Sequence, residues 1–177
     1  MDKKKAKKRP VAAVCSSLGT VLLIVLVAVC LPLTVPRVFG YQLYTVVSGS
    51  MEPAIPVGSL LYIQRASPEN IKQDDVIAFY AGHDSTAVIT HRVVENREFM
   101  GEFITKGDAN KKEDMEPVSY DNFIGKVRLT VPAAGKAAQA FSDTSGKIAA
   151  ASVIVLAVIL HGAAWKLEGR EDRDENK

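Results

Sequence analysis

Cysteine, histidine and tryptophan are scarce in this sequence of 177 residues, which has two Cys, three His and one Trp. Both cysteines, Cys15 and Cys30, lie in one apolar stretch. On a helix they would be about 22 Å apart, too far for a disulfide. The sequence has no C-x-x-C, H-E-x-x-H or EF-hand pattern. It therefore predicts neither a disulfide scaffold nor a metal or cofactor site.

Net charge is also low, with 22 Lys and Arg against 20 Asp and Glu, a formal +2 at pH 7. This balance argues against a nucleic-acid-binding protein, which needs a strongly basic surface. The 47% hydrophobic content excludes a disordered chain. A length of 177 residues leaves room for about one ordinary domain.

Charged side chains are absent from residues 10–36, which follow a basic tail, residues 1–10, with six Lys or Arg and one Asp. About 20 helical residues cross the hydrocarbon core of a bilayer, so residues 11–36 are predicted to form a transmembrane helix. The alternative is a cleaved secretory signal peptide, which has a shorter apolar core and a small-x-small cleavage site. Because basic flanks stay in the cytoplasm, the following chain is expected on the outer face.

A second run without formal charge covers residues 148–165 and is just long enough to cross a membrane. Its Ala-rich start and His161 leave an interfacial helix as the alternative. If the run crosses, the charged tail, residues 166–177, returns to the cytoplasm.

The segment between these runs, residues 37–147, carries 12 Lys and Arg and 14 Asp and Glu and is the predicted working domain. Short apolar runs separated by Gly and Pro are typical of β-strands, whereas no window keeps a 3.6-residue apolar period. We therefore expect a mainly β fold, a small, mostly antiparallel β-domain flanked by the two apolar helices. The expected strands are residues 41–47, 60–63, 76–80, 88–94, 99–105 and 123–131.

Two histidines lie in this segment. His83 occupies a polar turn, where an exposed imidazole without a special role is expected. His91 lies in an apolar strand, and the two-residue period places it on the same face as Ile89 and Val93. His91 is thus either a core histidine with one satisfied hydrogen bond or a base in a partly dry site.

Ser48 and Ser50 follow the first expected strand in the sequence Ser-Gly-Ser-Met-Glu-Pro. A serine there is normally a turn former. However, Ser50 comes only about fifteen residues after the first helix, which would hold a nucleophile near the bilayer, and Ser48 would face the same way in an extended chain. The polar loop after the fifth expected strand carries Asp108 and Asp114, which alone indicates only a turn.

Together the three segments resemble, in order and spacing, the motifs of type I signal peptidases. The matching residues are Ser-Gly-Ser-Met-Glu-Pro at 48–53, His-Arg-Val at 91–93 and Lys-Gly-Asp-Ala-Asn at 106–110. Histidine at position 91, where bacterial enzymes have lysine, is similar to the branch of archaea, the endoplasmic-reticulum signal peptidase complex and some endospore-forming bacteria. The resemblance covers about residues 44–131 and implies a small coiled β-domain on the outer membrane face.

The resemblance also implies a role for each motif residue. Ser50 would be the nucleophile and His91 the general base, while the Ser48 hydroxyl and the Ser50 backbone N–H would stabilise the oxyanion. An acid behind the histidine would fix its tautomer. Both Asp114 and Asp108 match acids of the family, and we expect Asp114 to be the partner of His91.

A serine–lysine dyad stays open because a desolvated lysine is also a base. The candidate lysines are Lys72, Lys106 and Lys126. In the family, however, the lysine base occupies the position that His91 holds here. The chain departs from the family pattern at Asp74, in place of Gly, and at Ser59, in place of Asp, and both departures are expected to be structural.

The resemblance implies a membrane-bound serine endopeptidase without a cofactor that removes signal peptides from secreted preproteins, cutting after small residues. Its partners would be preprotein signal peptides and the lipid bilayer, with further subunits left open. Its location would be the plasma membrane of a bacterium or archaeon, or the endoplasmic reticulum. An extended substrate would pair along an exposed strand edge such as residues 41–47.

The competing interpretation comes from a different class of protein. It is a non-catalytic, membrane-anchored β-module that binds a secreted partner. In that case Ser50 and His91 would be an ordinary turn residue and an ordinary core residue, and no peptide would be cleaved.

Overall fold

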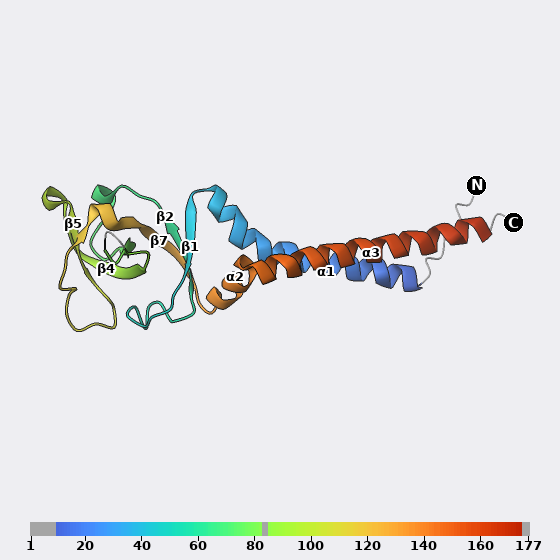
Figure 1. The fold of residues 1–177 in the computed structure, drawn as a ribbon, viewed down its shortest axis with the longest axis horizontal. Helices are drawn as coiled ribbons and strands as arrows, with labels where there is room; N and C mark the ends of the chain where they lie inside the picture. The colour runs from blue at the N-terminus through green and yellow to red at the C-terminus, as the bar shows by residue number, and fades with distance from the viewer. Residues whose placement is uncertain (1–9, 83–84, 175–177) are drawn as a thin grey trace. The chain divides into compact units, whose positions relative to one another are not determined.

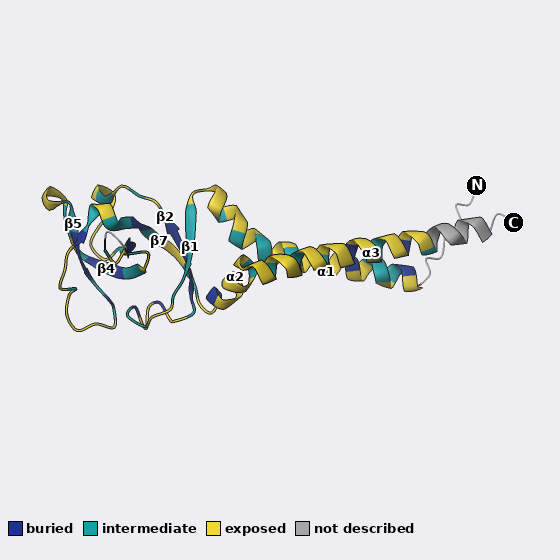
Figure 2. Cartoon of the chain, viewed as in Figure 1, coloured by how far each residue is buried: buried dark blue, intermediate teal, exposed yellow. Residues whose placement is uncertain are grey.

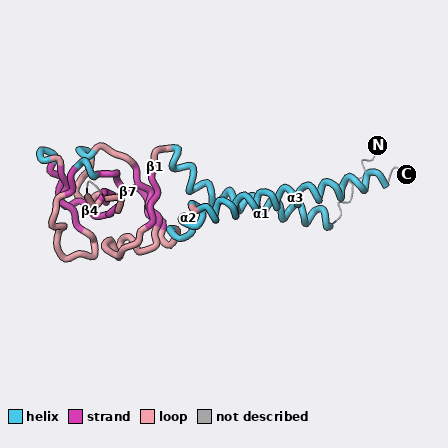
Figure 3. The backbone as a smooth tube through the Cα atoms, in the orientation of Figure 1, coloured by secondary structure: helices cyan, strands magenta, loops and turns pink. Residues whose placement is uncertain are grey.

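The computed structural model describes residues 10–82 and 85–174, with side chains described as far as residue 167. The chain divides into two compact units. The β-unit is Leu33–Ala140, and the helical unit combines Met1–Pro32 with Phe141–Lys177. All strands belong to the β-unit (Figure 3). The first nine residues of the basic tail, and His83, lie outside the described residues.

Two long helices, α1 (Pro10–Val38) and α3 (Thr144–Asp174), make up most of the helical unit. Each contains a stretch that is long and apolar enough to cross a membrane, with mean hydropathy 2.7 in α1 and 2.2 over Thr144–Leu167. Most of their described side chains are exposed (Figure 2). The two predicted apolar helices are therefore present, each somewhat longer than its predicted span.

Small residues and one histidine pack within the helical unit. The buried small residues are Ala12, Gly19, Ala157 and Ala164. A Cβ added to Gly19 would lie 2.5 Å from His161 Nδ1 and 3.2 Å from the Ala157 carbonyl oxygen. His161 also lies 2.8 Å from the Ala157 carbonyl oxygen through Nδ1 and 3.3 Å from Thr20 Oγ1 through Nε2. The absent side chain at Gly19 thus leaves room for this imidazole between the helices.

Seven strands form one antiparallel sheet in the order β1-β2-β7-β3-β4-β5-β6. Figure 1 labels β1, β2, β4, β5 and β7 in the β-unit. Their bounds are β1 Tyr41–Thr45, β2 Leu60–Gln64, β3 Val76–Tyr80, β4 Val88–Arg97, β5 Glu102–Lys106, β6 Val118–Ser119 and β7 Phe123–Val131. The expected mainly β, antiparallel fold is confirmed.

The sheet is coiled so that its central strands are buried on both faces. In β3, Ala78 packs in one hydrophobic cluster, while Ile77 and Phe79 pack in another on the opposite face. Register shifts interrupt the pairing of β2 with β7, of β3 with β7 and of β4 with β5. Such irregularities bend strands and increase twist, which lets a sheet of short strands wrap around its own core.

Some elements differ from the expected ones. β4 runs on to Arg97, and β5 starts only at Glu102, because residues 98–100 form a 3₁₀ turn that ends at Gly101 with φ 67°. The two-residue strand β6 and the helix α2 (Gly135–Ser142) were not predicted. α2 contributes Ala138 to a cluster with Leu60 and Tyr62 of β2.

Candidate active site

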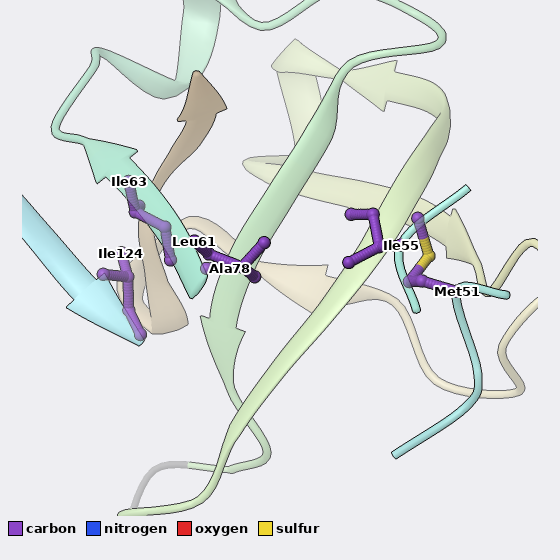
Figure 4. Close-up of a cluster of buried hydrophobic side chains, with 6 residues drawn as sticks. All are labelled: Met51, Ile55, Leu61, Ile63, Ala78 and Ile124. Atoms are coloured by element: carbon purple, nitrogen blue, oxygen red, sulfur yellow. The ribbon is translucent and has the colours of Figure 1, made fainter. Parts of the chain in front are cut away.

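Ser50 lies in the loop, residues 46–59, that connects β1 to β2. The base of this loop is closed by backbone hydrogen bonds from Val46 to Ser59 (2.9 Å) and from Gly58 to Val46 (2.9 Å). Just after Ser50, Met51 and Ile55 are 2% and 5% exposed and point into a hydrophobic cluster of the β-unit (Figure 4). Burial of these two side chains fixes the turn that presents Ser50.

Ser48 and Ser50 do not lie on an extended chain, because the backbone bends at residues 48–50. Both nevertheless line the same cavity of about 290 Å³. Within the described chain, neither the Ser50 N–H nor the Ser50 hydroxyl donates a hydrogen bond. Two donors of this serine are thus free to meet a ligand in the cavity.

His91 lies in β4, opposite Ile77 of β3, and is 8% exposed. The Phe79 ring approaches its imidazole edge-on, with ring centroids 6.1 Å apart. His91 Nδ1 lies 2.6 Å from Asp114 Oδ2. Because an ionised carboxylate can only accept, Nδ1 donates this hydrogen bond, and Nε2 of the neutral ring keeps a lone pair.

Asp114 lies in the loop that follows β5 and is tied back to that strand. Its backbone N–H donates to the Thr105 carbonyl oxygen (2.9 Å), and the buried Thr105 hydroxyl donates to Asp114 Oδ2 (2.6 Å). The carboxylate oxygen that accepts from His91 is therefore also held by a second donor. Sequence reasoning missed this role of Thr105, whose only sequence signal is its place at a strand end before a polar loop.

Asp108 pairs with Arg92 and not with His91. Arg92 Nε and Nη2 donate to the two Asp108 carboxylate oxygens at 2.8 and 2.7 Å, and Nη1 donates to the Asp74 carbonyl oxygen at 2.8 Å. The hydrogen bonds with Asp108 raise the pKa of the Arg92 guanidinium above its ordinary value. Alternation along β4 sends His91 and Arg92 to opposite faces, so the two acids serve different partners.

The Ser50 backbone carbonyl and the His91 ring both approach Gly107, which is buried. A Cβ added to Gly107 would lie 2.7 Å from the Ser50 carbonyl oxygen and 3.0 Å from His91 Nε2. Those two atoms are therefore less than about 6 Å apart. The Ser50 carbonyl oxygen also accepts a hydrogen bond from the Ala109 N–H at 2.9 Å. Ser50 and His91 are not hydrogen-bonded to each other in the described chain.

Three other positions that the sequence singled out, Lys126, Asp74 and Ser59, have structural roles. Lys126 forms an ion pair with Asp75 at 2.5 Å. Asp74 adopts a positive φ of 70°, a conformation that glycine adopts most easily. Ser59 is fully buried and donates to the Pro56 carbonyl oxygen at 2.6 Å.

The cavity at Ser50 separates two strand edges. Residues 44–48 line it together with Thr86 and residues 88–90, and Met51, Ile55 and Leu61 are also in the lining. β1 is one of the two edge strands of the sheet. On β4, pairing with β5 begins only at Arg92, so residues 88–91 pair with β3 alone among the described strands. The cavity is thus a groove between two open strand edges.

Comparison with known proteins identifies a family and several relatives to which this chain is similar. Residues 17–95 match the family model "Signal peptidase, peptidase S26". Signal peptidase I W of Bacillus subtilis (strain 168) is 41% identical over 91 residues, which cover 49% of this chain and 46% of that protein. The signal peptidase complex catalytic subunit SEC11 of Schizophyllum commune is 30% identical over 123 residues, covering 55% and 63%.

The human signal peptidase complex catalytic subunit SEC11C is 32% identical over 101 residues, covering 51% of this chain and 52% of that subunit. The chain thus spans roughly half to two thirds of the length of the curated relatives it matches. Ser48, Ser50 and His91 fall inside the stretch that the family model matches, whereas Asp108 and Asp114 lie beyond it.

Proposed function

We propose that this chain is a signal peptidase of family S26, of the type found in the endoplasmic reticulum, archaea and endospore-forming bacteria, and a membrane-bound serine endopeptidase. It removes N-terminal signal peptides from secreted preproteins at the outer membrane face. The family match over residues 17–95 and the similarity to Signal peptidase I W and to SEC11C support this proposal. The observation that carries this proposal is the pair of His91 and Asp114, joined at 2.6 Å, with its free ring nitrogen directed at the Gly107 position next to Ser50.

In the proposed reaction, Ser50 Oγ attacks the carbonyl carbon of the scissile bond and its proton passes to His91 Nε2. A serine hydroxyl is a weak nucleophile at neutral pH and needs such a base. Asp114 keeps the proton of the neutral ring on Nδ1 and stabilises the imidazolium. His91 Nε2 then gives the proton to the leaving amine, and water attacks the acyl-serine with the same base.

The Ser50 N–H and the Ser48 hydroxyl stabilise the oxyanion of the tetrahedral intermediate. Both groups border the groove, and the N–H has no other partner in the described chain. Donors that are already aimed at developing negative charge each contribute a factor of about 10² to 10³ in kcat.

The groove would hold the residues that precede the cut. An extended peptide placed between the edges of β1 and β4 makes main-chain hydrogen bonds to one or both strands, which gives affinity without sequence preference. The volume of about 290 Å³ and the apolar side chains of Met51 and Ile55 favour small, uncharged substrate residues. This shape supports the proposed cleavage after small residues.

The two apolar helices, each long enough to cross a bilayer, support a location in a membrane. The basic residues before α1 keep that end in the cytoplasm, which puts the β-unit on the outer face and returns the chain through α3. The membrane is the plasma membrane of a bacterium or archaeon, or the endoplasmic reticulum.

The test is co-expression of a preprotein with the wild-type chain and with Ser50→Ala and His91→Ala. Processing should be lost in both variants, because one lacks the nucleophile and the other the base. Ser67→Ala is the matched control, since Ser67 is exposed and its side chain caps no helix. Processing by Ser50→Ala would refute the proposal, and no cleavage by any form would favour the non-catalytic binding module.

A further inference from the structure

A third polar group converges on the point where Ser50 and His91 meet. A Cβ added to Gly107 would lie 2.8 Å from Asn110 Nδ2, in addition to 2.7 Å from the Ser50 carbonyl oxygen and 3.0 Å from His91 Nε2. The Asn110 amide is therefore within about 6 Å of both groups. A side chain at position 107 would fill the space that these three groups share.

The backbone around Asn110 is fixed, whereas its side chain is not engaged. The Asn110 N–H donates to the Gly107 carbonyl oxygen and the Ala109 N–H to the Ser50 carbonyl oxygen, both at 2.9 Å. The bidentate pair of Asp108 with Arg92 holds the same loop to β4. Asn110 is exposed, and its amide forms no hydrogen bond in the described chain.

The position of this amide indicates which part of a substrate it meets. Residues before the cut occupy the groove between β1 and β4, and Asn110 does not line that groove. The proton on His91 Nε2 must reach the leaving amine, so the chain after the cut passes the atoms around Gly107. An asparagine amide has both donors and an acceptor, as a peptide main chain does.

We propose that Asn110 binds the main chain of the first residues after the cleaved bond and thereby holds the leaving amine beside His91 Nε2. This inference rests on the proposed peptidase function and assigns a substrate-binding residue to the same site. Because main-chain groups are common to all peptides, Asn110 contributes binding that does not depend on the sequence of the mature protein.

The experiment compares two substrates with identical residues before the cut, using the full chain in detergent micelles. One continues for five residues after the cut, and the other ends there as a thiobenzyl ester, which offers no main chain on the leaving side. Asn110→Ala should lower kcat/KM about tenfold for the peptide, the effect of one lost hydrogen bond. It should leave kcat/KM for the ester within twofold.

Lys111→Ala is the matched control, because Lys111 is exposed in the same loop. It should leave kcat/KM unchanged for both substrates. Equal losses on both substrates with Asn110→Ala would overturn the inference and assign the residue to loop structure. A loss on neither substrate, or the same selective loss with Lys111→Ala, would overturn it as well. A wild-type chain that cleaves neither substrate would instead refute the proposed function itself.

Discussion

Two neighbouring residues of β4, His91 and Arg92, divide the acids of the site between them. His91 is hydrogen-bonded to Asp114, and the same carboxylate oxygen of Asp114 also accepts a hydrogen bond from the Thr105 hydroxyl. Arg92 donates hydrogen bonds to both carboxylate oxygens of Asp108. Asp114 can therefore act on the protonation of His91, the proposed base, whereas Asp108 acts on the position of the loop that contains Gly107.

Asp114→Asn should consequently affect mainly kcat, whereas Asp108→Asn should affect mainly stability. An amide at position 114 no longer fixes the tautomer of His91, so we expect kcat to fall by about 10³ to 10⁴ with little loss of stability. An amide at position 108 weakens a charge-assisted pair and should lower the free energy of unfolding by roughly 1–3 kcal/mol. Peptide cleavage and denaturant unfolding, measured on both purified variants, distinguish the two effects. A smaller loss of kcat in Asp114→Asn than in Asp108→Asn would contradict the assignment.

Sequence motifs were sufficient to predict Ser50 and His91 as candidates, because each lies in a short characteristic segment. The resemblance favoured Asp114 over Asp108 as the partner of His91, and the structure joins His91 to Asp114. Local sequence alone could not make this choice. Asp108 and Asp114 share one polar loop, and their partners depend on how that loop crosses the two faces of β4. Asn110 was also missed as a candidate. Its proposed role rests on its position near Ser50 and His91 around Gly107, and these residues are far apart in the sequence.

Strands were predicted more reliably than the short elements between them. β3 and β7 have the expected bounds, because alternating or continuous apolar residues end at clear turn residues. β6 has two residues and exists only through pairing with β5, so no local pattern marks it. α2 has eight residues and packs through Ala138, which gives a period too short to recognise.

Asp75 joins two elements, since it accepts from Lys126 of β7 and from the Lys72 N–H in the turn before β3. Burial alone would raise the pKa of Asp75, but these hydrogen bonds, chiefly that of Lys126, lower it below the ordinary 3.8. A lowered pKa means that folding favours the carboxylate. The stabilisation is thus complete above pH 3.8 and is lost as the pH falls through the folded-state value.

Asp75→Asn should therefore lower the free energy of unfolding by roughly 1–2 kcal/mol at pH 7. The difference from wild type should shrink as the pH drops below 3.8, because the wild-type carboxylate then becomes protonated. Denaturant unfolding at several pH values measures this. Asp121→Asn serves as control, since Asp121 is exposed, and a difference at Asp75 that does not change with pH would contradict the role of its charge.

At the scale of the whole molecule, a β-unit with a candidate active site is combined with a pair of apolar helices in one chain. Association of helices in lipid depends on small residues that allow close approach and on polar contacts between helices. Gly19 and His161 supply both in the helical unit. His161, which left an interfacial helix as the alternative in the sequence analysis, therefore packs against Gly19 within the helical unit.

Gly19→Ile should disrupt this packing, because its added atoms would meet His161 and the Ala157 carbonyl oxygen. Gly162→Ile is the matched control, since a Cβ at Gly162 meets nothing within 4 Å. Helix melting followed by circular dichroism in micelles should show a lower transition temperature for Gly19→Ile than for Gly162→Ile. Equal transitions would mean that the helices do not depend on this contact.

The groove between β1 and β4 has a consequence for handling the protein. Its two open edges leave unpaired main-chain donors and acceptors in a row, and such edges are templates on which strands of other molecules add. We therefore expect the β-unit to aggregate most readily at the empty groove, through edge-to-edge pairing of strands from different molecules. A peptide bound in the groove would cap both edges, so we expect an added peptide ligand to reduce aggregation of the β-unit.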